Sequence, residues 1–126
     1  MNNEQLRPRK VSFGEAVQLY FANYVNFNGR ASKSEYWWAV LFNYLVIFVL
    51  SMINESVGSI ASLLLFLPTL SVSVRRLHDT GKAWYYYLFG CIPLAGFIIL
   101  IVFFCQDSVG DNQWGLGPEE MSYTNY

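Results

Sequence analysis

The stretch VRRLHDTGKAWYYY, residues 74–87, gathers the side chains of this sequence that could do chemistry. His78 is the only histidine among 126 residues, and Asp79 follows it directly. An adjacent imidazole and carboxylate could share a metal ion or relay a proton. Two arginines precede this pair and Lys82 follows it. The same stretch could therefore equally be a charged loop pinned to one face of a membrane.

A metal or hydrolytic centre needs more partners than this pair supplies. Zinc takes about four ligands, and the sequence has no second histidine. Cys91 and Cys105 lie within one long apolar run, where a helix would hold them about 21 Å apart, too far for a disulfide. The GxSxG, P-loop and HExxH motifs are absent from the sequence. We expect no catalytic residue, no metal and no cofactor, and a structural or electrostatic role for His78 and Asp79.

The composition predicts that these residues sit beside a membrane. Hydrophobic residues make up 54% of the chain and charged residues 13%, whereas soluble proteins carry about 25% charged residues. Three uncharged runs have 19 residues or more, and a helix of that length spans about 28 Å, close to the hydrocarbon core of a bilayer. We predict an all-α integral membrane protein with three transmembrane helices, over about residues 33–54, 57–76 and 83–106.

A shorter helix is predicted ahead of the first span, over about residues 13–27. Ser12 and Glu15 fit a capping box at its start. Apolar and aromatic residues then recur at helical spacing along one stripe: Phe13, Val17, Tyr20, Phe21, Tyr24 and Val25. This amphipathic helix either lies along the membrane interface or packs on the other helices, and the two arrangements are compatible.

The predicted spans carry signals for helix starts, anchoring and bending. Ser32 and Glu35 form a second capping box before the first span. Gly58 and Ser62 are a small-xxx-small pair that allows close helix packing, and Pro68 is expected to kink the second span. Aromatic residues typical of the membrane interface stand where the first and third spans begin: Trp37, Trp38, Trp84 and Tyr85.

The charges predict an orientation and one ion pair. With three spans, all eight Lys and Arg residues fall on one side and none on the other. The positive-inside rule then places the N-terminus in the cytoplasm and the C-terminus on the opposite side. A carboxylate at the start of a span is unfavourable without a partner, so we expect Glu35 to pair with Arg75 or Arg76. Asp79 can also sit beside either arginine if the helix continues.

Three stretches of the sequence resemble the small bacterial inner-membrane proteins grouped as domain of unknown function 805. They are NFNGRASKSEYWW, RRLHDTGKAWYYYLFGCIPLAG and GDNQWGLGP, and the resemblance covers about residues 20–118. It implies a multi-pass protein of the bacterial cytoplasmic membrane and no particular activity. The matching positions are our candidate functional residues: Gly29, Arg30, Glu35, Tyr36, Trp37, Arg75, Arg76, His78, Asp79, Lys82, Asn112, Gly115 and Pro118.

These observations give one membrane domain over residues 12–118, a flexible basic N-terminus over 1–11 and a polar tail over 107–126. We expect a non-enzymatic scaffold or accessory protein of the inner membrane. Its basic cytoplasmic face would meet anionic lipid headgroups, another membrane protein or further copies of itself, and not nucleic acid. The alternatives are a small oligomeric transporter or channel subunit, and a membrane-interface enzyme that uses His78 and Asp79.

Overall fold

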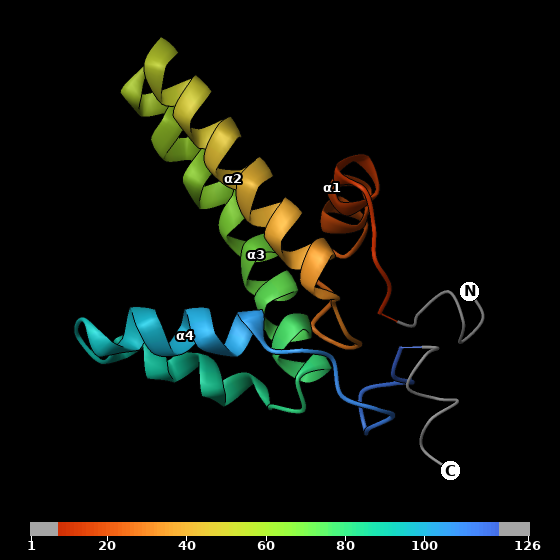
Figure 1. The fold of residues 1–126 in the computed structure, drawn as a ribbon. Coiled ribbons are helices and arrows are strands. Elements are labelled where there is room, and N and C mark those ends of the chain that lie inside the picture. Colours follow the sequence, from red (N-terminus) through yellow and green to blue (C-terminus); the bar gives the residue numbers. More distant parts are fainter. Residues whose placement is uncertain (1–7, 119–126) are drawn as a thin grey trace.

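The structure, a computed structural model, describes residues 8–118, and its elements there are all helical. Helices α2 and α3 form a long antiparallel hairpin, and η1 and α4 form a shorter hairpin that crosses one end of it (Figure 1). This confirms the all-α class. The elements in chain order are α1 (Phe13–Ala22), α2 (Lys33–Ile53), α3 (Glu55–Asp79), the 3₁₀-helix η1 (Trp84–Cys91) and α4 (Ala95–Cys105).

Helices α2 and α3 correspond to the first two predicted spans. Both helices are long and apolar enough to cross a bilayer. No other helix among the described residues meets both conditions. The outward-facing side chains of α2 and α3 form a wide exposed apolar surface, which suits lipid better than water. It includes Tyr44, Phe48, Met52, Leu63, Leu64 and Phe66.

The two helices join tightly, and the start of α2 is capped as predicted. The Ser32 hydroxyl accepts a hydrogen bond from the Glu35 amide at 3.2 Å and begins α2. Asn54 ends α2 and also caps α3, because its side chain accepts from the Ser56 amide at 2.8 Å. A Cβ atom at Gly58 would lie 2.9 Å from the Ser51 Cα, so only glycine permits this close approach of the two helices.

Helix α1 packs across the hairpin, beside the first part of α2 (Figure 1). The Ser12 hydroxyl accepts from the Glu15 amide at 3.3 Å, which confirms the predicted cap. Tyr20 is fully buried against α2 and α3, whereas Phe13 and Phe21 remain exposed. This confirms the predicted packing of α1 on the other helices, while its position along the membrane interface stays a prediction.

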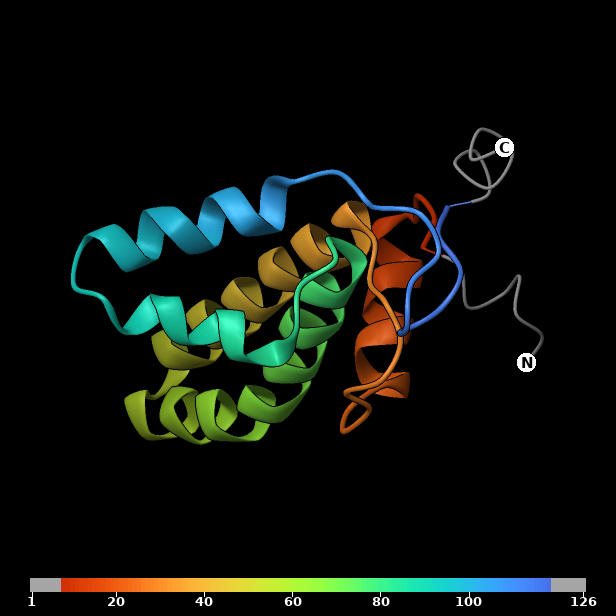
Figure 2. The same cartoon turned by 90° about the horizontal axis from the view of Figure 1, so that it is seen from below.

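Helix α3 is bent (Figure 2) and contains Pro68 in its interior. Proline has no N–H, so the carbonyl of Leu64, four residues earlier, loses its helical partner. The Tyr24 hydroxyl donates a hydrogen bond to that carbonyl. The Tyr20 hydroxyl donates to the next carbonyl, that of Leu65, at 3.2 Å. Tyr24 thus satisfies the carbonyl that Pro68 deprives of its partner and that an apolar environment would otherwise leave unpaired.

This arrangement predicts an interaction between two substitutions. Tyr24→Phe should lower the free energy of unfolding by about 1 kcal/mol, because it leaves the Leu64 carbonyl without a donor. In a Pro68→Ala background the same change should be clearly less harmful, because the alanine N–H can bond that carbonyl. Unfolding in detergent measures the cycle, with Tyr44→Phe as an exposed control on α2. Additive effects would contradict the explanation.

The third predicted span is wrong, because residues 83–106 do not form one helix. Proline at position 93 disfavours a helical conformation at the residue before it, and Ile92 is extended with ψ 120°. Leu94 then adopts a positive φ of 63°, and the chain reverses. Helices η1 and α4 pack side by side, and a Cβ at Gly96 would lie 2.5 Å from the Phe89 carbonyl oxygen. Helix α4 has 11 residues, about half of what a span needs.

The reversal brings the chain after α4 back to the end of α3 (Figure 2). The Val109 amide donates to the Asp79 carbonyl at 2.9 Å, and Lys82 bonds the Gln106 side chain. Residues 106–118 therefore lie at the end of the hairpin where α2 begins and α3 ends. The predicted third span would instead carry residues 106–118 to the far end of the hairpin.

The predicted flexible N-terminus lies partly outside the described residues. Within residues 8–11 the chain packs on the protein, because the Val11 side chain is buried and its amide donates to the Ser34 hydroxyl at 2.9 Å.

The apolar core is formed by residues of α1, α2, α3 and α4 and of the loop before α2. Its members are Tyr20, Ala31, Tyr36, Ala39, Leu65, Val72, Leu77 and Phe104.

Candidate functional site

The last turns of α3 are polar and yet buried. Every residue from 71 to 80 is buried, including Arg75, Arg76, His78 and Asp79. Charged side chains are buried only where partners compensate for lost hydration. The partners come from the loop before α2, from the first turn of α2 and from residues 104–115, so distant stretches of the sequence meet at this end of α3.

Asp79 is the centre of this cluster. One carboxylate oxygen lies 3.0 Å from the Arg30 Nε and the other 2.5 Å from the Arg76 Nη1. The Ser108 hydroxyl donates to the second oxygen as well. The side chains of Asp79, Arg30 and Arg76 are all inaccessible to solvent. The predicted pairing of Asp79 with an arginine of its own helix is confirmed for Arg76.

The other N–H groups of Arg30 and Arg76 donate hydrogen bonds to backbone carbonyls. Arg30 donates to the carbonyls of Asp79, Val109, Gly110 and Gly115. Arg76 donates to those of Ala31, Phe104 and Gln106. Every guanidinium nitrogen of both side chains is therefore bonded. The arginines act as clamps that fix the loop before α2 and the chain after α4 against the end of α3.

A second ion pair joins the start of α2 to the end of α3. The Arg75 Nη1 lies 2.6 Å from the Glu35 Oε2, and both side chains are at least nine-tenths buried. This confirms the predicted pairing of Glu35 with one of the two arginines. The Ala31 amide also donates to the Arg75 carbonyl at 3.0 Å. The Nε and Nη2 of Arg75 have no hydrogen-bond partner among the described residues.

His78 has a structural environment. Its Nδ1 lies 3.0 Å from the Gly29 carbonyl oxygen, which can only accept, so Nδ1 carries the proton. Its ring stacks on Trp114 with centroids 4.3 Å apart and planes 3° apart. The Asn112 side chain donates to the His78 carbonyl at 3.0 Å. His78 thus contacts the loop before α2 through its hydrogen bond to Gly29 and the tail through its stacking on Trp114.

The tail motif forms the tight turn that this stacking requires. The backbones of Asn112 and Gly115 bond each other in both directions, at 3.0 and 3.1 Å, and Gly115 has a φ of 146°. The Asn112 side chain accepts from the Trp114 amide at 2.9 Å. This turn presents Trp114 to His78 and the Gly115 carbonyl to Arg30. The three sequence stretches that carry the family resemblance therefore form one cluster.

Other candidate residues lie at the margin of this cluster. Tyr36 stacks on Phe104 with centroids 4.4 Å apart, and Trp37 packs edge-on against Tyr36. Lys82 bonds Thr80 and Gln106, and burial together with the Arg76 charge lowers its pKa. Of the proposed interface anchors, Trp38, Trp84 and Tyr85 are exposed, whereas Trp37 is partly buried.

Sequence reasoning missed two features of the site. Ser108 bonds Asp79, but a lone serine after an apolar run gives no signal of that role. The pairing of Arg30 with Asp79 had a signal, since both belong to the resemblance and a buried aspartate needs cationic partners. No group of three or more His, Cys, Asp or Glu residues that could hold a metal occurs in residues 8–118.

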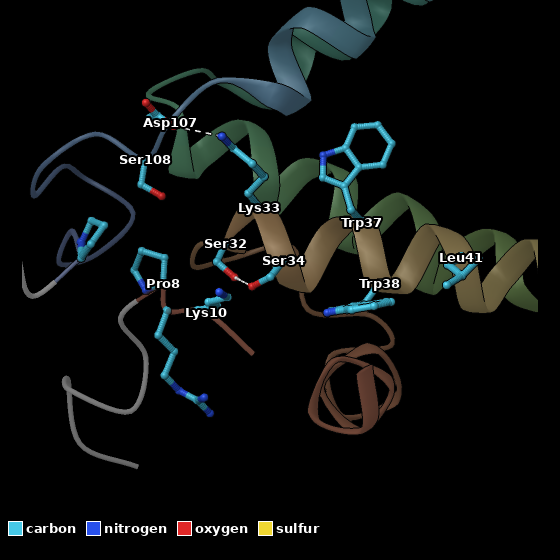
Figure 3. A pocket seen from close by; sticks show the side chains of 12 residues that line it. Pro8, Lys10, Ser32, Lys33, Ser34, Trp37, Trp38, Leu41, Asp107 and Ser108 are labelled. Carbon is cyan, nitrogen blue, oxygen red and sulfur yellow. Dashed lines mark hydrogen bonds and ion pairs between the residues drawn. The ribbon is translucent and has the colours of Figure 1, made fainter. Parts of the chain in front are cut away.

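A cavity of about 730 Å³ lies beside the start of α2 (Figure 3). Lys33 reaches Asp107 at 2.9 Å across one side of it, and this cation lowers the pKa of the Asp107 carboxyl. Basic and hydroxyl side chains thus stand next to indole rings and an aliphatic residue, a combination that suits an amphipathic ligand. The lining includes Pro8, Lys10, Ser32, Lys33, Ser34, Trp37, Trp38, Leu41, Ser108 and Pro118.

Known proteins place this architecture in a family. Residues 24–116 match the family described as "Protein of unknown function (DUF805)". The "Inner membrane protein YhaH" of Escherichia coli (strain K12) is 38% identical over 109 residues, covering 77% of this chain and 90% of that protein. The "Inner membrane protein YhaI" of the same strain is 36% identical over 105 residues, covering 77% of this chain and 89% of that protein.

No solved structure matches the chain with significance. The family match extends from the end of α1 to the tail turn, and so includes every residue of the Asp79 cluster. These relatives are inner membrane proteins by name, which agrees with the two long apolar helices of this chain. This chain therefore belongs to the DUF805 family of membrane proteins of unknown function.

Proposed function

We propose that this protein is a non-enzymatic scaffold or accessory protein of the bacterial inner membrane. Two observations support the location. Its relatives in Escherichia coli are inner membrane proteins by name, and α2 and α3 have the length and hydropathy that a bilayer requires. In this proposal α2 and α3 cross the membrane, and the η1–α4 hairpin lies in one leaflet or along its surface, because neither arm is long enough to span it.

The observation that carries the non-enzymatic role is the burial of the side chains that could do chemistry. Asp79 is 0% exposed and His78 is 5% exposed. Both oxygens of the Asp79 carboxylate and the Nδ1 of His78 already have partners within the protein. A general acid or base must reach a substrate proton, and the fully buried, fully bonded Asp79 carboxylate cannot do so. The cluster is therefore best explained as a structural element that holds the loop before α2 and the chain after α4 against the end of α3.

The same arrangement supports an orientation. All eight Lys and Arg residues of the sequence precede α2, begin it, or lie at and just after the end of α3. The far end of the hairpin, near Glu55, has none. The positive-inside rule then predicts that the end where α2 begins and α3 ends faces the cytoplasm. Residues 106–118 belong to the same end, so in this proposal they are cytoplasmic too.

The partners proposed for this face are anionic lipid headgroups and other membrane proteins. Arg30, Arg75 and Arg76 are buried in the cluster and do not contribute to a surface. Lys10 and Lys33 are exposed beside Trp37 and Trp38 in the cavity of Figure 3. Each cation near an anionic leaflet contributes about 1 kcal/mol of attraction. Copies of the chain could also assemble through the exposed apolar faces of α2 and α3.

The substitution His78→Phe tests the non-enzymatic role. Phenylalanine keeps a flat ring for Trp114 but cannot transfer a proton or bind a metal. We expect the variant to accumulate in the membrane and to restore a deletion strain in any condition where loss of the gene impairs growth. The losses should be limited to one hydrogen bond, about 1 kcal/mol of stability. Failure to complement at normal abundance and normal melting temperature would show that the imidazole does chemistry.

A further inference from the structure

His78 has one ring nitrogen that the protein bonds and one that it does not. Its Nδ1 donates to the Gly29 carbonyl, so in the neutral imidazole Nε2 is a hydrogen-bond acceptor. Nε2 has no partner among the described residues. The buried side-chain nitrogens there that lack both a partner and accessible surface belong to Arg75. Nε2 is therefore an unpaired acceptor that keeps accessible surface, on a side chain that is only 5% exposed.

His78 lines a cavity between the end of α3, η1, the loop before α2 and the tail turn. The cavity measures about 510 Å³, within the range of about 300–1,000 Å³ that is typical of small-molecule sites. Such sites are mostly apolar, with a few polar groups that orient the ligand. All the described residues of this wall are apolar or aromatic except His78 and Asn28. His78 is thus in place to orient a bound molecule.

The wall favours a neutral ligand that donates a hydrogen bond. None of the described residues that line the cavity is a Lys, Arg, Asp or Glu. A charged ligand would lose its hydration there without gaining an ionic partner. The lone pair of Nε2 can only accept, so the group that meets it must be a donor. Among common neutral groups, the hydroxyl of a phenol is a particularly strong donor.

The rings around the cavity favour an aromatic ligand. Trp84 and Tyr87 come from η1, Phe27 comes from the loop before α2, and Trp114 comes from the tail turn. Trp114 already covers one face of the His78 ring, so a ligand meets the edge of the imidazole, where Nε2 lies. Contacts between aromatic rings are favourable beyond the apolar area that they bury.

The rim of the cavity on η1 is apolar and open. Trp84 is 59% exposed and Leu88 is 56% exposed. In the arrangement proposed above, η1 lies in one leaflet or along its surface, so an apolar chain attached to the ligand can continue into lipid. A membrane quinol combines these features, because its headgroup is a hydroxylated aromatic ring that carries an apolar chain.

We propose that this cavity binds a hydroxylated aromatic ring, whose hydroxyl donates a hydrogen bond to the Nε2 of His78. The ring belongs either to a membrane quinol or to a soluble phenol. The quinol source rests on the membrane location proposed above, whereas the site itself does not. Binding involves no transfer of a proton or an electron, so it adds a ligand to the scaffold role and leaves the imidazole non-catalytic.

The experiment uses the full chain purified in detergent and kept free of oxygen. Thermal unfolding is followed with naphthol and with its methyl ether, which has the same rings but no donor. Decylubiquinol and its oxidised form, decylubiquinone, are the matched pair with an apolar chain. We expect saturable stabilisation by the hydroxylated member of a pair, and at least about fivefold weaker binding of the other member. Saturation at the lower concentration by decylubiquinol assigns the site to a quinol, and by naphthol to a soluble phenol.

Three variants test the site itself. His78→Phe keeps a flat ring for Trp114 but lacks Nε2. It should bind naphthol at least about fivefold more weakly and the methyl ether as the wild type does, a loss of selectivity that lower stability alone does not produce. Leu88→Trp puts a large ring at the exposed rim and should abolish binding of both, even if His78→Phe fails to fold. Leu45→Trp, at an exposed leucine of α2 outside the cavity, is the matched control and should bind normally.

Three results would each overturn the proposal: no stabilisation of the wild type by either hydroxylated probe, equal stabilisation by both members of each pair, or undiminished binding in His78→Phe and Leu88→Trp. The complementation experiment tests the scaffold role separately. A His78→Phe variant that complements but no longer distinguishes naphthol from its ether supports both proposals. A failure to complement that Leu88→Trp shares would come from lost ligand binding and not from catalysis, because Leu88→Trp keeps the imidazole.

Discussion

Replacing Asp79 by asparagine is expected to lower the free energy of unfolding by about 3–5 kcal/mol. The change keeps the shape of the side chain but removes the one carboxylate that lies between Arg30 and Arg76. Two buried guanidinium groups would then have no counter-charge, and breaking a buried ion pair in this way leaves an uncompensated charge. We expect a strong loss of the protein from membranes and a lower melting temperature in detergent.

The matched control for this prediction is Asp107→Asn. Asp107 lies 2.9 Å from the Lys33 Nζ, but its side chain is 95% exposed. Water and salt screen such a pair, and it contributes little to stability. We expect its melting temperature to equal that of the wild type within error. An Asp79→Asn variant that melts with this control would show that the cluster does not hold the fold together.

A reporter that is active only in the cytoplasm is expected to be active when fused to the C-terminus. The η1–α4 hairpin returns the chain to the end of α3, where Arg76 and Lys82 contact Gln106. The proposed arrangement of two spanning helices instead of three predicts both ends of the chain on the same side. The effect is all-or-none, because three spans would place the C-terminus outside, where this reporter is silent.

Two further fusions make the orientation measurable. A reporter that requires export should be active after Asn54, between α2 and α3, and silent after Lys82. The fusion after Lys82 is the internal control, because two and three spans predict the same result there. Export-dependent activity at the C-terminus would disprove the two-span arrangement and restore the third span.

Part of this protein was accessible from local sequence alone. The starts of α1 and α2 followed from Ser12 and Ser32, because a capping hydroxyl bonds an amide three residues ahead. The two long helices followed from apolar runs whose length matches a bilayer. The pairing of Glu35 with Arg75 or Arg76 followed from the unfavourable energy of an unpaired carboxylate at the start of an apolar helix, and the structure selects Arg75.

The failed prediction of a third span has a local cause. Hydropathy measures only how apolar a run is, and residues 83–106 are apolar whether they form one helix or two. Pro93 interrupts this run, but proline is compatible with both a kink and a reversal. The reversal was decided by packing, since Gly96 lets the backbone of α4 come against Phe89 and Gly90.

The sequence by itself determined the helical class, the two long apolar helices, the capped starts of α1 and α2 and the concentration of basic residues at one end. These properties depend on composition and on neighbours within one or two helical turns. Only the tertiary structure decided what the motif residues do. Asp79 meets Arg30 across 49 positions of sequence, and His78 meets Trp114 only because the η1–α4 hairpin folds back. Such contacts depend on where the chain reverses, which no local pattern specifies.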